Sequence, residues 1–133
     1  MSEEFKLDIV TPEKLFVSKN DVIEVVVPSL EGEMGILKDH IPIISFLKPG
    51  ILKIISKNNN EESYFIEDGI LEFKDNSLSI LTSIIFDLKN SDKNYITNSL
   101  KDAEKLLSNE NLDDQERFLI NQKIDVLKSL SIN

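Results

Sequence analysis

A change in hydrophobic periodicity near Asp87–Ser91 constrains the fold of this 133-residue chain more than any other feature. Before that point, apolar and polar residues tend to alternate every second position, which is the period of a half-buried β-strand. From Asp92 onward there is no glycine and no proline, and apolar residues recur every three or four positions, as on one face of an α-helix. The sequence therefore predicts two domains, with strands in residues 1–87 and helices in residues 88–133.

The first domain contains short apolar segments rich in β-branched side chains and separated by turn residues. The predicted strands cover residues 5–9, 15–17, 22–27, 50–55, 63–66, 70–73 and 77–81. Pro28 is expected to end the third strand, because proline cannot donate a backbone hydrogen bond. Glu67-Asp68-Gly69 is typical of a hairpin turn between the fifth and sixth strands. No helical segment separates the strands, so an antiparallel β-sandwich or barrel is expected.

The second domain shows two amphipathic helices with a short break between them. The apolar stripes expected to pack the hairpin are Ile96, Leu100, Ala103 and Leu107 in the first helix, and Ile120, Ile124 and Leu127 in the second. Asn109–Asn111 interrupts the pattern, and Asn111 is a candidate N-cap of the second helix. The predicted fold is therefore an N-terminal antiparallel β-sandwich followed by a C-terminal two-helix antiparallel hairpin. Two short helices bury little surface, so the hairpin is expected to need a further surface to lie on.

Composition excludes several classes of function. The net charge of −9 disfavours binding to nucleic acid and to anionic membrane surfaces. The absence of cysteine excludes disulfides, thiolate zinc sites and cysteine nucleophiles. The N-terminal segment is acidic, and no apolar run is long enough to span a bilayer, so we expect a soluble intracellular chain that reaches membranes only through other proteins.

Few residues are candidates for chemistry. His40 is the single histidine, and a lone imidazole without thiols does not make a zinc site. Glu31 and Glu33 flank Gly32, but alternate loop acids are more often solvated than catalytic. Met34 and Ile36 are apolar residues among glycines and acids, which is typical of a tight turn that presents an apolar tip to a protein partner. The residues alone therefore indicate an interaction protein with no catalytic residues, no cofactor and no metal.

Several short motifs, in register across residues 5–86, carry a resemblance to a known family. They are Phe5–Glu13, Gly32–Leu37, His40-x-Pro42, Leu47–Leu52, Gly69–Glu72 and Leu78–Leu81. With their order and spacing, the chain resembles the epsilon subunits of bacterial-type F-type ATP synthases. The helical hairpin agrees with that family in architecture only.

The resemblance implies a non-catalytic subunit of the central stalk. Its expected partners are the gamma subunit, the membrane ring of c subunits and the catalytic alpha/beta head. The implied function is to couple proton-driven rotation to ATP synthesis, with a hairpin that can rise and block ATP hydrolysis. The implied location is the cytoplasmic face of the cell's inner (plasma) membrane, as a peripheral subunit. Glu31, Glu33, Met34, Ile36 and His40 fall in the segment that touches the ring in this family.

Two departures from the family concern the hairpin. Members that bind ATP there carry an apolar-Asp-x-x-Arg-Ala motif, of which this chain keeps Asp92 but has Tyr95 and Ile96 at the Arg and Ala positions. A guanidinium contact to phosphate is thereby lost, so no useful ATP affinity is expected. From Asp92 to the C-terminus, six Lys/Arg stand against eight Asp/Glu, a net charge of −2. This charge predicts weak docking against acidic loops of the head and a dominant folded-down hairpin.

Two alternatives belong to other classes of function. The first is a free-standing β-sandwich protein-binding module with a helical dimerisation tail, although the chain has no Trp and only 7% aromatic residues to line a groove. The second is a small hydrolase in which His40 would activate a nucleophile. Capture from native membranes separates these hypotheses, because only a stalk subunit recovers gamma and the catalytic subunits.

Overall fold

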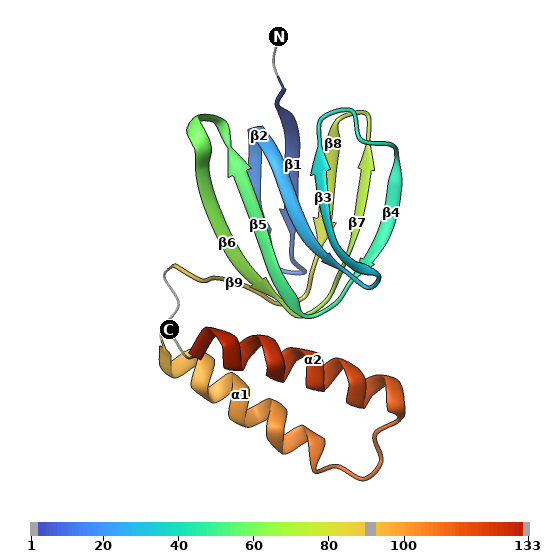
Figure 1. Ribbon diagram of the computed structural model, residues 1–133, viewed down its shortest axis with the longest axis vertical. Coiled ribbons are helices and arrows are strands. Elements are labelled where there is room, and N and C mark those ends of the chain that lie inside the picture. The colour runs from blue at the N-terminus through green and yellow to red at the C-terminus, as the bar shows by residue number, and fades with distance from the viewer. Residues whose placement is uncertain (1–2, 90–92, 132–133) are drawn as a thin grey trace. The chain divides into compact units, whose positions relative to one another are not determined.

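The computed structural model of the chain describes residues 3–89 and 93–131. The chain divides into two compact units, Met1–Lys89 and Asn90–Asn133. The first unit is a β-sandwich (Figure 1). Its strands are β1 (Phe5–Val10), β2 (Leu15–Ser29), β3 (Gly32–Leu37), β4 (Ile43–Leu47), β5 (Gly50–Ser56), β6 (Asn60–Ile66), β7 (Gly69–Lys74), β8 (Ser77–Leu81) and β9 (Ile85–Asp87), with a short 3-10 turn at Lys57–Asn59.

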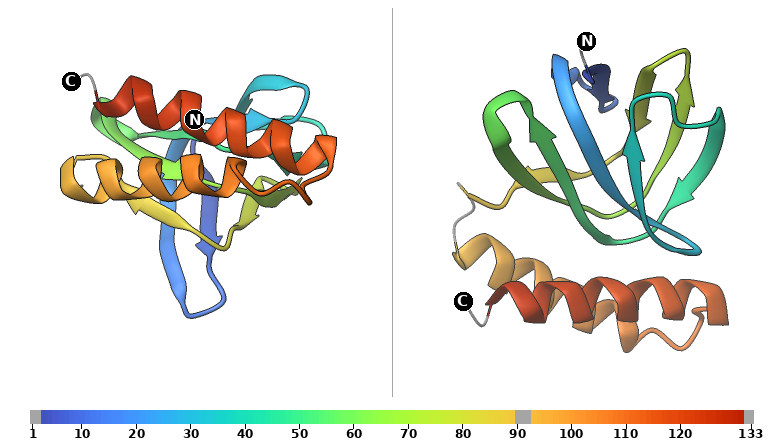
Figure 2. Two further views of the ribbon diagram at one scale, coloured as in Figure 1. Left: turned by 90° about the horizontal axis from the view of Figure 1, so that it is seen from below. Right: turned by 45° about the horizontal axis from the view of Figure 1, so that its top comes forward.

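The long strand β2 joins the two layers of the sandwich. Its first half pairs with β1 from Leu15 to Val22. Its second half pairs with β5 from Val22 to Val26 and with β3 from Glu24 to Ser29. One layer therefore has the order β3-β2-β5-β6-β9, and the other continues from β1 through β8 and β7 to β4. Only the β1–β8 pair is parallel among the pairings of the described strands. The two layers face each other across the core (Figure 2, right).

The core forms because alternate side chains of each strand point between the layers. Its fully buried residues include Leu7, Ile9, Val25, Val27, Ile36, Leu52, Ile54, Ile66, Leu71, Phe73, Leu78 and Ile80. The Phe5 and Phe73 rings meet edge to face with their centroids 5.6 Å apart. Burying one such side chain is worth roughly 1.5–3 kcal/mol, so a set of this size drives folding of the sandwich.

Two strand predictions were wrong in detail. The segments 15–17 and 22–27 form one continuous strand, and β2 runs through Pro28 to Ser29 instead of stopping before the proline. Pro28 opposes Glu33 of β3, and its carbonyl oxygen accepts a hydrogen bond of 3.0 Å from the Lys48 amide. Proline lacks a backbone N–H group, but its carbonyl oxygen still accepts a hydrogen bond and its φ is compatible with a strand. A strand can therefore continue through proline where no donor is needed at that position.

Glu67-Asp68-Gly69 does not form a hairpin turn. β6 pairs with β5 and β9, whereas β7 pairs with β4 and β8, so this connection crosses from one layer to the other. The turn residues were recognised correctly, but turn chemistry alone does not determine which strand becomes the partner.

The second unit contains two helices, α1 (Lys93–Leu107) and α2 (Asp114–Ser131), which lie side by side in a hairpin (Figure 2, left). Among the residues expected to pack it, Ile96, Ala103, Ile124 and Leu127 are buried, and Leu100, Leu107 and Ile120 are half-buried. No helix in the described part of the chain combines the length and the apolar character needed to cross a membrane.

The N-cap of α2 is Asp113 and not the predicted Asn111. The Asp113 Oδ1 atom accepts a hydrogen bond of 2.7 Å from the Glu116 amide, and Glu116 Oε1 lies 3.5 Å from the Asp113 amide. This reciprocal pair is a capping box, which satisfies two backbone donors at the helix start. The Asn111 amide instead donates to Asn109 Oδ1 at 2.9 Å, inside the interhelical link.

Candidate functional site

The β2–β3 hairpin carries most of the residues predicted to contact a partner. Glu31 and Glu33 are exposed, as expected for acids that face solvent or a partner. Met34 is only half-exposed and packs against the core, and Ile36 is fully buried in it. The expectation that Ile36 forms an exposed apolar tip was therefore wrong. Gly32–Leu37 is a strand whose alternation turns Met34 and Ile36 inward, and the tight turn is confined to Leu30–Glu31.

His40 lies at the other end of β3 from Glu31. The six residues of β3 separate the two positions, which corresponds to about 20 Å of extended chain. The His40 ring meets the Phe73 ring edge to face with centroids 5.9 Å apart, and its Nδ1 atom lies 2.8 Å from the Ile41 carbonyl oxygen. The five residues predicted as one contact region thus divide between the two ends of the sandwich and its core.

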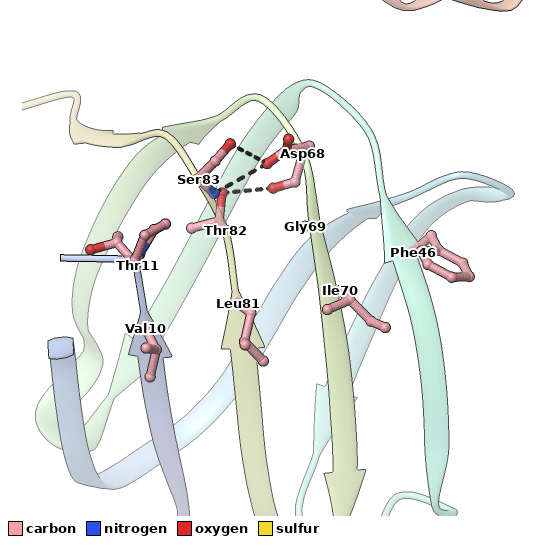
Figure 3. Close-up of a pocket in the computed structure, with 10 residues that line it drawn as sticks. Val10, Thr11, Phe46, Asp68, Gly69, Ile70, Leu81, Thr82 and Ser83 are labelled. Carbon is pink, nitrogen blue, oxygen red and sulfur yellow. Dashed lines mark hydrogen bonds between the residues drawn. The ribbon is translucent and has the colours of Figure 1, made fainter. Parts of the chain in front are cut away.

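Sequence reasoning missed an apolar feature of the outer surface. Along the outer face of β1, β8, β7 and β4, four apolar side chains stand in one row, with Val10 opposite Leu81, Leu81 opposite Ile70 and Ile70 opposite Phe46. Leu30 extends this row, because its amide donates a hydrogen bond of 3.1 Å to the Phe46 carbonyl oxygen. We call these five residues the apolar strip, of which Figure 3 shows Val10, Phe46, Ile70 and Leu81.

The apolar strip is accessible to a partner. Phe46 is 61% exposed, and Leu81 and Leu30 are each 52% exposed. Part of the strip lines an open pocket of about 600 Å³, whose other lining residues are Thr11, Pro12, Asp68, Gly69, Thr82 and Ser83. The next row along the same face is mostly polar, since Asp8, Ser79 and Glu72 face outward there. An apolar row bordered by polar residues is typical of a protein-binding surface.

A network of hydrogen bonds fixes the end of the sheet beside the apolar strip. The buried Thr82 hydroxyl donates to the Asp68 carbonyl oxygen at 2.7 Å, and the Ser83 hydroxyl donates to Asp68 Oδ1 at 2.8 Å (Figure 3). The Thr82 amide donates to the Val10 carbonyl oxygen at 3.1 Å. These bonds hold the β6–β7 and β8–β9 connections together, so the strip rests on a defined backbone.

A charged cluster connects the first half of β2 to β6. Lys19 Nζ lies 2.5 Å from Glu62 Oε1, and the Tyr64 hydroxyl donates to Glu62 Oε2 at 2.6 Å. Partial burial raises the pKa of Glu62, but the hydrogen bonds from Lys19 and Tyr64 outweigh it and bring the pKa below its usual value. Burial and the Glu62 hydrogen bond together raise the pKa of Tyr64. Phe16 packs edge to face on Tyr64 at 5.7 Å, so the cluster closes this side of the sandwich.

No group of three or more potential metal ligands is found among the described residues. The outer surface of the sandwich instead carries the exposed apolar strip, which is suited to contact with another protein.

Comparison with known proteins defines the class. Residues 4–87 match the family described as ATP synthase, Delta/Epsilon chain, beta-sandwich domain. The chain belongs to this family.

Similar proteins specify the kind of subunit. An ATP synthase epsilon chain from Pelagibacter ubique (strain HTCC1062) is 67% identical over 100 residues, which cover 75% of this chain and 76% of that protein. An ATP synthase epsilon chain from Clostridium kluyveri is 38% identical over 98 residues, covering 70% and 74%. The expectation of an ATP synthase epsilon subunit is confirmed, and the chain is a non-catalytic subunit of a rotary ATP synthase.

Solved structures agree on the fold. A chain of the Euglena gracilis mitochondrial ATP synthase matches with a TM-score of 0.75 and 20% identity, over 99% of this chain and 81% of that one. A chain from the central stalk and c-ring structure of the Tetrahymena thermophila mitochondrial ATP synthase matches with a TM-score of 0.65 and 14% identity, over 95% of each. The predicted fold, a β-sandwich followed by two C-terminal helices, is confirmed.

Proposed function

We propose that this chain is a coupling subunit of the central stalk, which binds the gamma subunit through its apolar strip and helps to transmit rotation during ATP synthesis. The observation that carries the proposal is the in-register row from Val10 to Phe46 on one outer face of the sandwich, in which Leu81 and Phe46 are exposed. The alternative of a free-standing binding module is not favoured, because residues 4–87 match a family of ATP synthase subunits.

The tip of the β2–β3 hairpin is the proposed contact with the membrane ring of c subunits. Glu31 in the turn and Glu33 in β3 are exposed there, next to Leu30 at the end of the apolar strip. With a net charge of −9, the chain gains nothing from direct binding to anionic lipid. The other subunits of the complex would therefore hold the chain at the cytoplasmic face of the inner membrane. They would also couple it to the proton-driven ring.

The hairpin is the proposed regulatory element. Its net charge of −2 opposes docking on acidic loops of the catalytic alpha/beta head, so inhibition of hydrolysis should be weak. Asp92, the retained acid of the nucleotide motif, lies outside the described residues. Tyr95 is 48% exposed and supplies no guanidinium, and Ile96 is buried. These features support a hairpin without a useful site for ATP.

Affinity capture tests the proposal. The tagged full chain, captured from its native membranes, should recover gamma and the alpha/beta head. The double variant Phe46→Asp/Leu81→Asp should reduce the recovered gamma by about tenfold or more, because it buries unpaired carboxylates at the interface.

Lys57→Asp is the matched control for that variant. It changes the net charge by the same amount at an exposed residue of the 3-10 turn between β5 and β6, which belongs to the other layer of the sandwich. Its recovery of gamma should equal that of the wild type. A soluble homodimer that brings down no ATP synthase subunit would contradict the proposed function.

A further inference from the structure

Asp39 and Asn76, which are 37 residues apart in sequence, hold two turns together by a reciprocal pair of hydrogen bonds. The Asp39 amide donates to Asn76 Oδ1 at 2.7 Å, and the Asn76 side-chain amide donates to Asp39 Oδ1 at 3.0 Å. Both residues have left-handed backbones, with φ of 66° and 56°. Such backbones are unfavourable for most side chains, although asparagine and aspartate tolerate them better than others. The pair therefore joins two turns at the same end of the sandwich.

The joined turns are fixed to the rest of the sandwich. The Lys6 amide of β1 donates to the Asn76 carbonyl oxygen at 3.1 Å, which anchors the β7–β8 turn. In the loop 38–42, the His40 amide donates to the Leu37 carbonyl oxygen at 3.1 Å, and the His40 ring packs on Phe73. The loop therefore has backbone, side-chain and ring contacts that define its conformation.

This fixed loop presents an exposed apolar side chain. Ile41 is 71% exposed, the highest value among the large apolar side chains of the described residues. Ile44 follows on β4 at 65% exposed and points to the same outer face as Phe46. Ile44 therefore continues the apolar strip along β4, and Ile41 is exposed two residues before this strand begins.

We infer that Asn76 is a positioning residue that, through Asp39, presets the 38–42 loop so that Ile41 docks on the same gamma subunit that covers the apolar strip. The inference rests on the proposed function. Its physical basis is that a side chain held in its bound position before association loses less conformational entropy on binding. The occupant is gamma because Ile44 continues the surface assigned to gamma, and Ile41 lies only two residues before the start of the same strand.

Glycine substitutions separate the side-chain contact from the backbone strain. Asn76→Gly removes both reciprocal bonds, whereas Asp39→Gly removes only the one that the Asp39 carboxylate accepts. Each variant keeps a residue that accepts a positive φ. Asp75→Gly is the matched control, since Asp75 is the adjacent turn residue with φ of 53° and takes no part in the pair. In the full chain, Asn76→Gly should raise the exchange rate of the Asp39 amide about tenfold, and Asp75→Gly should leave it unchanged.

Binding to the gamma-containing catalytic complex, depleted of its own copy of this chain, provides the functional measurement. Asn76→Gly should weaken binding by about tenfold, and the double variant Asp39→Gly/Asn76→Gly should be no weaker than Asn76→Gly alone. Ile41→Ala should weaken binding of the wild type more than it weakens binding of Asn76→Gly. A merely structural role would instead lower the melting temperature of Asn76→Gly without changing its affinity.

Two outcomes would overturn the inference. Unchanged affinity of Asn76→Gly, with the Asp39 amide exchanging faster, would show that the loop does not dock on gamma while leaving the proposed function intact. Failure of the wild-type chain to bind the depleted complex at all would overturn the proposed function as well.

Discussion

Arg117 of α2 donates a hydrogen bond from Nη1 to the carbonyl oxygen of Leu107, the last residue of α1, at 3.1 Å. Its Nη2 atom also lies 3.4 Å from the Asn109 carbonyl oxygen. The last carbonyl groups of a helix lack partners within it, and a cation placed there also meets the negative end of the helix dipole. One side chain of the second helix thus closes the end of the first and fixes the link between them.

Replacing Arg117 should loosen the hairpin at its link. Arg117→Met keeps an apolar stem but removes the donors, so we expect the hairpin to lose about 1–2 kcal/mol of stability. Hydrogen exchange should show faster opening of residues 105–113, with the strands of the sandwich unaffected. Lys101→Met, on the exposed face of α1, is the control and should leave exchange unchanged. Equal exchange in both variants would mean that the guanidinium does not stabilise the link.

The capping box of α2 provides a second test in the hairpin. Asp113→Ala should destabilise the start of α2 by about 1 kcal/mol, because the Glu116 amide loses its acceptor. Asn111→Ala should have a much smaller effect, since Asn111 lies in the link before the cap. Amide exchange at residues 114–118 distinguishes the two variants, and a larger effect at Asn111 would restore the N-cap assigned from sequence.

The sandwich should fold without the hairpin. Its core residues, listed above, all come from β1–β8, and strand pairing is complete by Asp87 at the end of β9. A fragment of residues 1–87 should therefore show a single cooperative unfolding transition by circular dichroism in urea. A fragment that binds hydrophobic dye and unfolds without cooperativity would show that the hairpin completes the core.

The Lys19–Glu62–Tyr64 cluster should make the stability of the sandwich depend on pH. The folded-state pKa of Glu62 is lowered, so its contribution is present above the unfolded-state pKa and is lost as pH falls through the folded-state value. The urea midpoint of the wild type should therefore fall between pH 7 and pH 3 by more than that of Glu62→Gln. Glu61→Gln is the control, because Glu61 is the more exposed neighbour that pairs with Lys53. Parallel pH profiles for wild type and Glu62→Gln would refute the assignment.

Removing the hairpin should have a small effect on catalysis by the complex. Deletion of residues 88–133 should leave ATP synthesis intact and raise ATP hydrolysis only modestly, because the negative hairpin docks poorly on acidic loops of the head. Both rates can be measured in membranes that carry the truncated chain. A large rise in hydrolysis would mean that the extended hairpin dominates and that its net charge of −2 is too small to decide the balance.

The sequence by itself determined the two-part organisation and the type of most elements. Period-two alternation in segments such as Phe5–Ile9 and Ser77–Leu81 identified strands, and the three- and four-residue spacing from Ile96 to Leu107 identified a helix. These signals are local, because each strand or helix must turn one face toward a core wherever its partners come from. The family resemblance depended on local motifs as well, and the match of residues 4–87 confirms it.

Only the tertiary structure decided which elements became neighbours and which side chains stayed outside. Pro28 lies within a strand, the turn at Asp68 crosses between layers, and Ile36 faces the core, because strand pairing and register are set by contacts between distant residues. The apolar strip could not be read from the sequence for the same reason. Val10, Phe46, Ile70 and Leu81 come from four separate strands, and they form one row only when the sheet brings those strands into register.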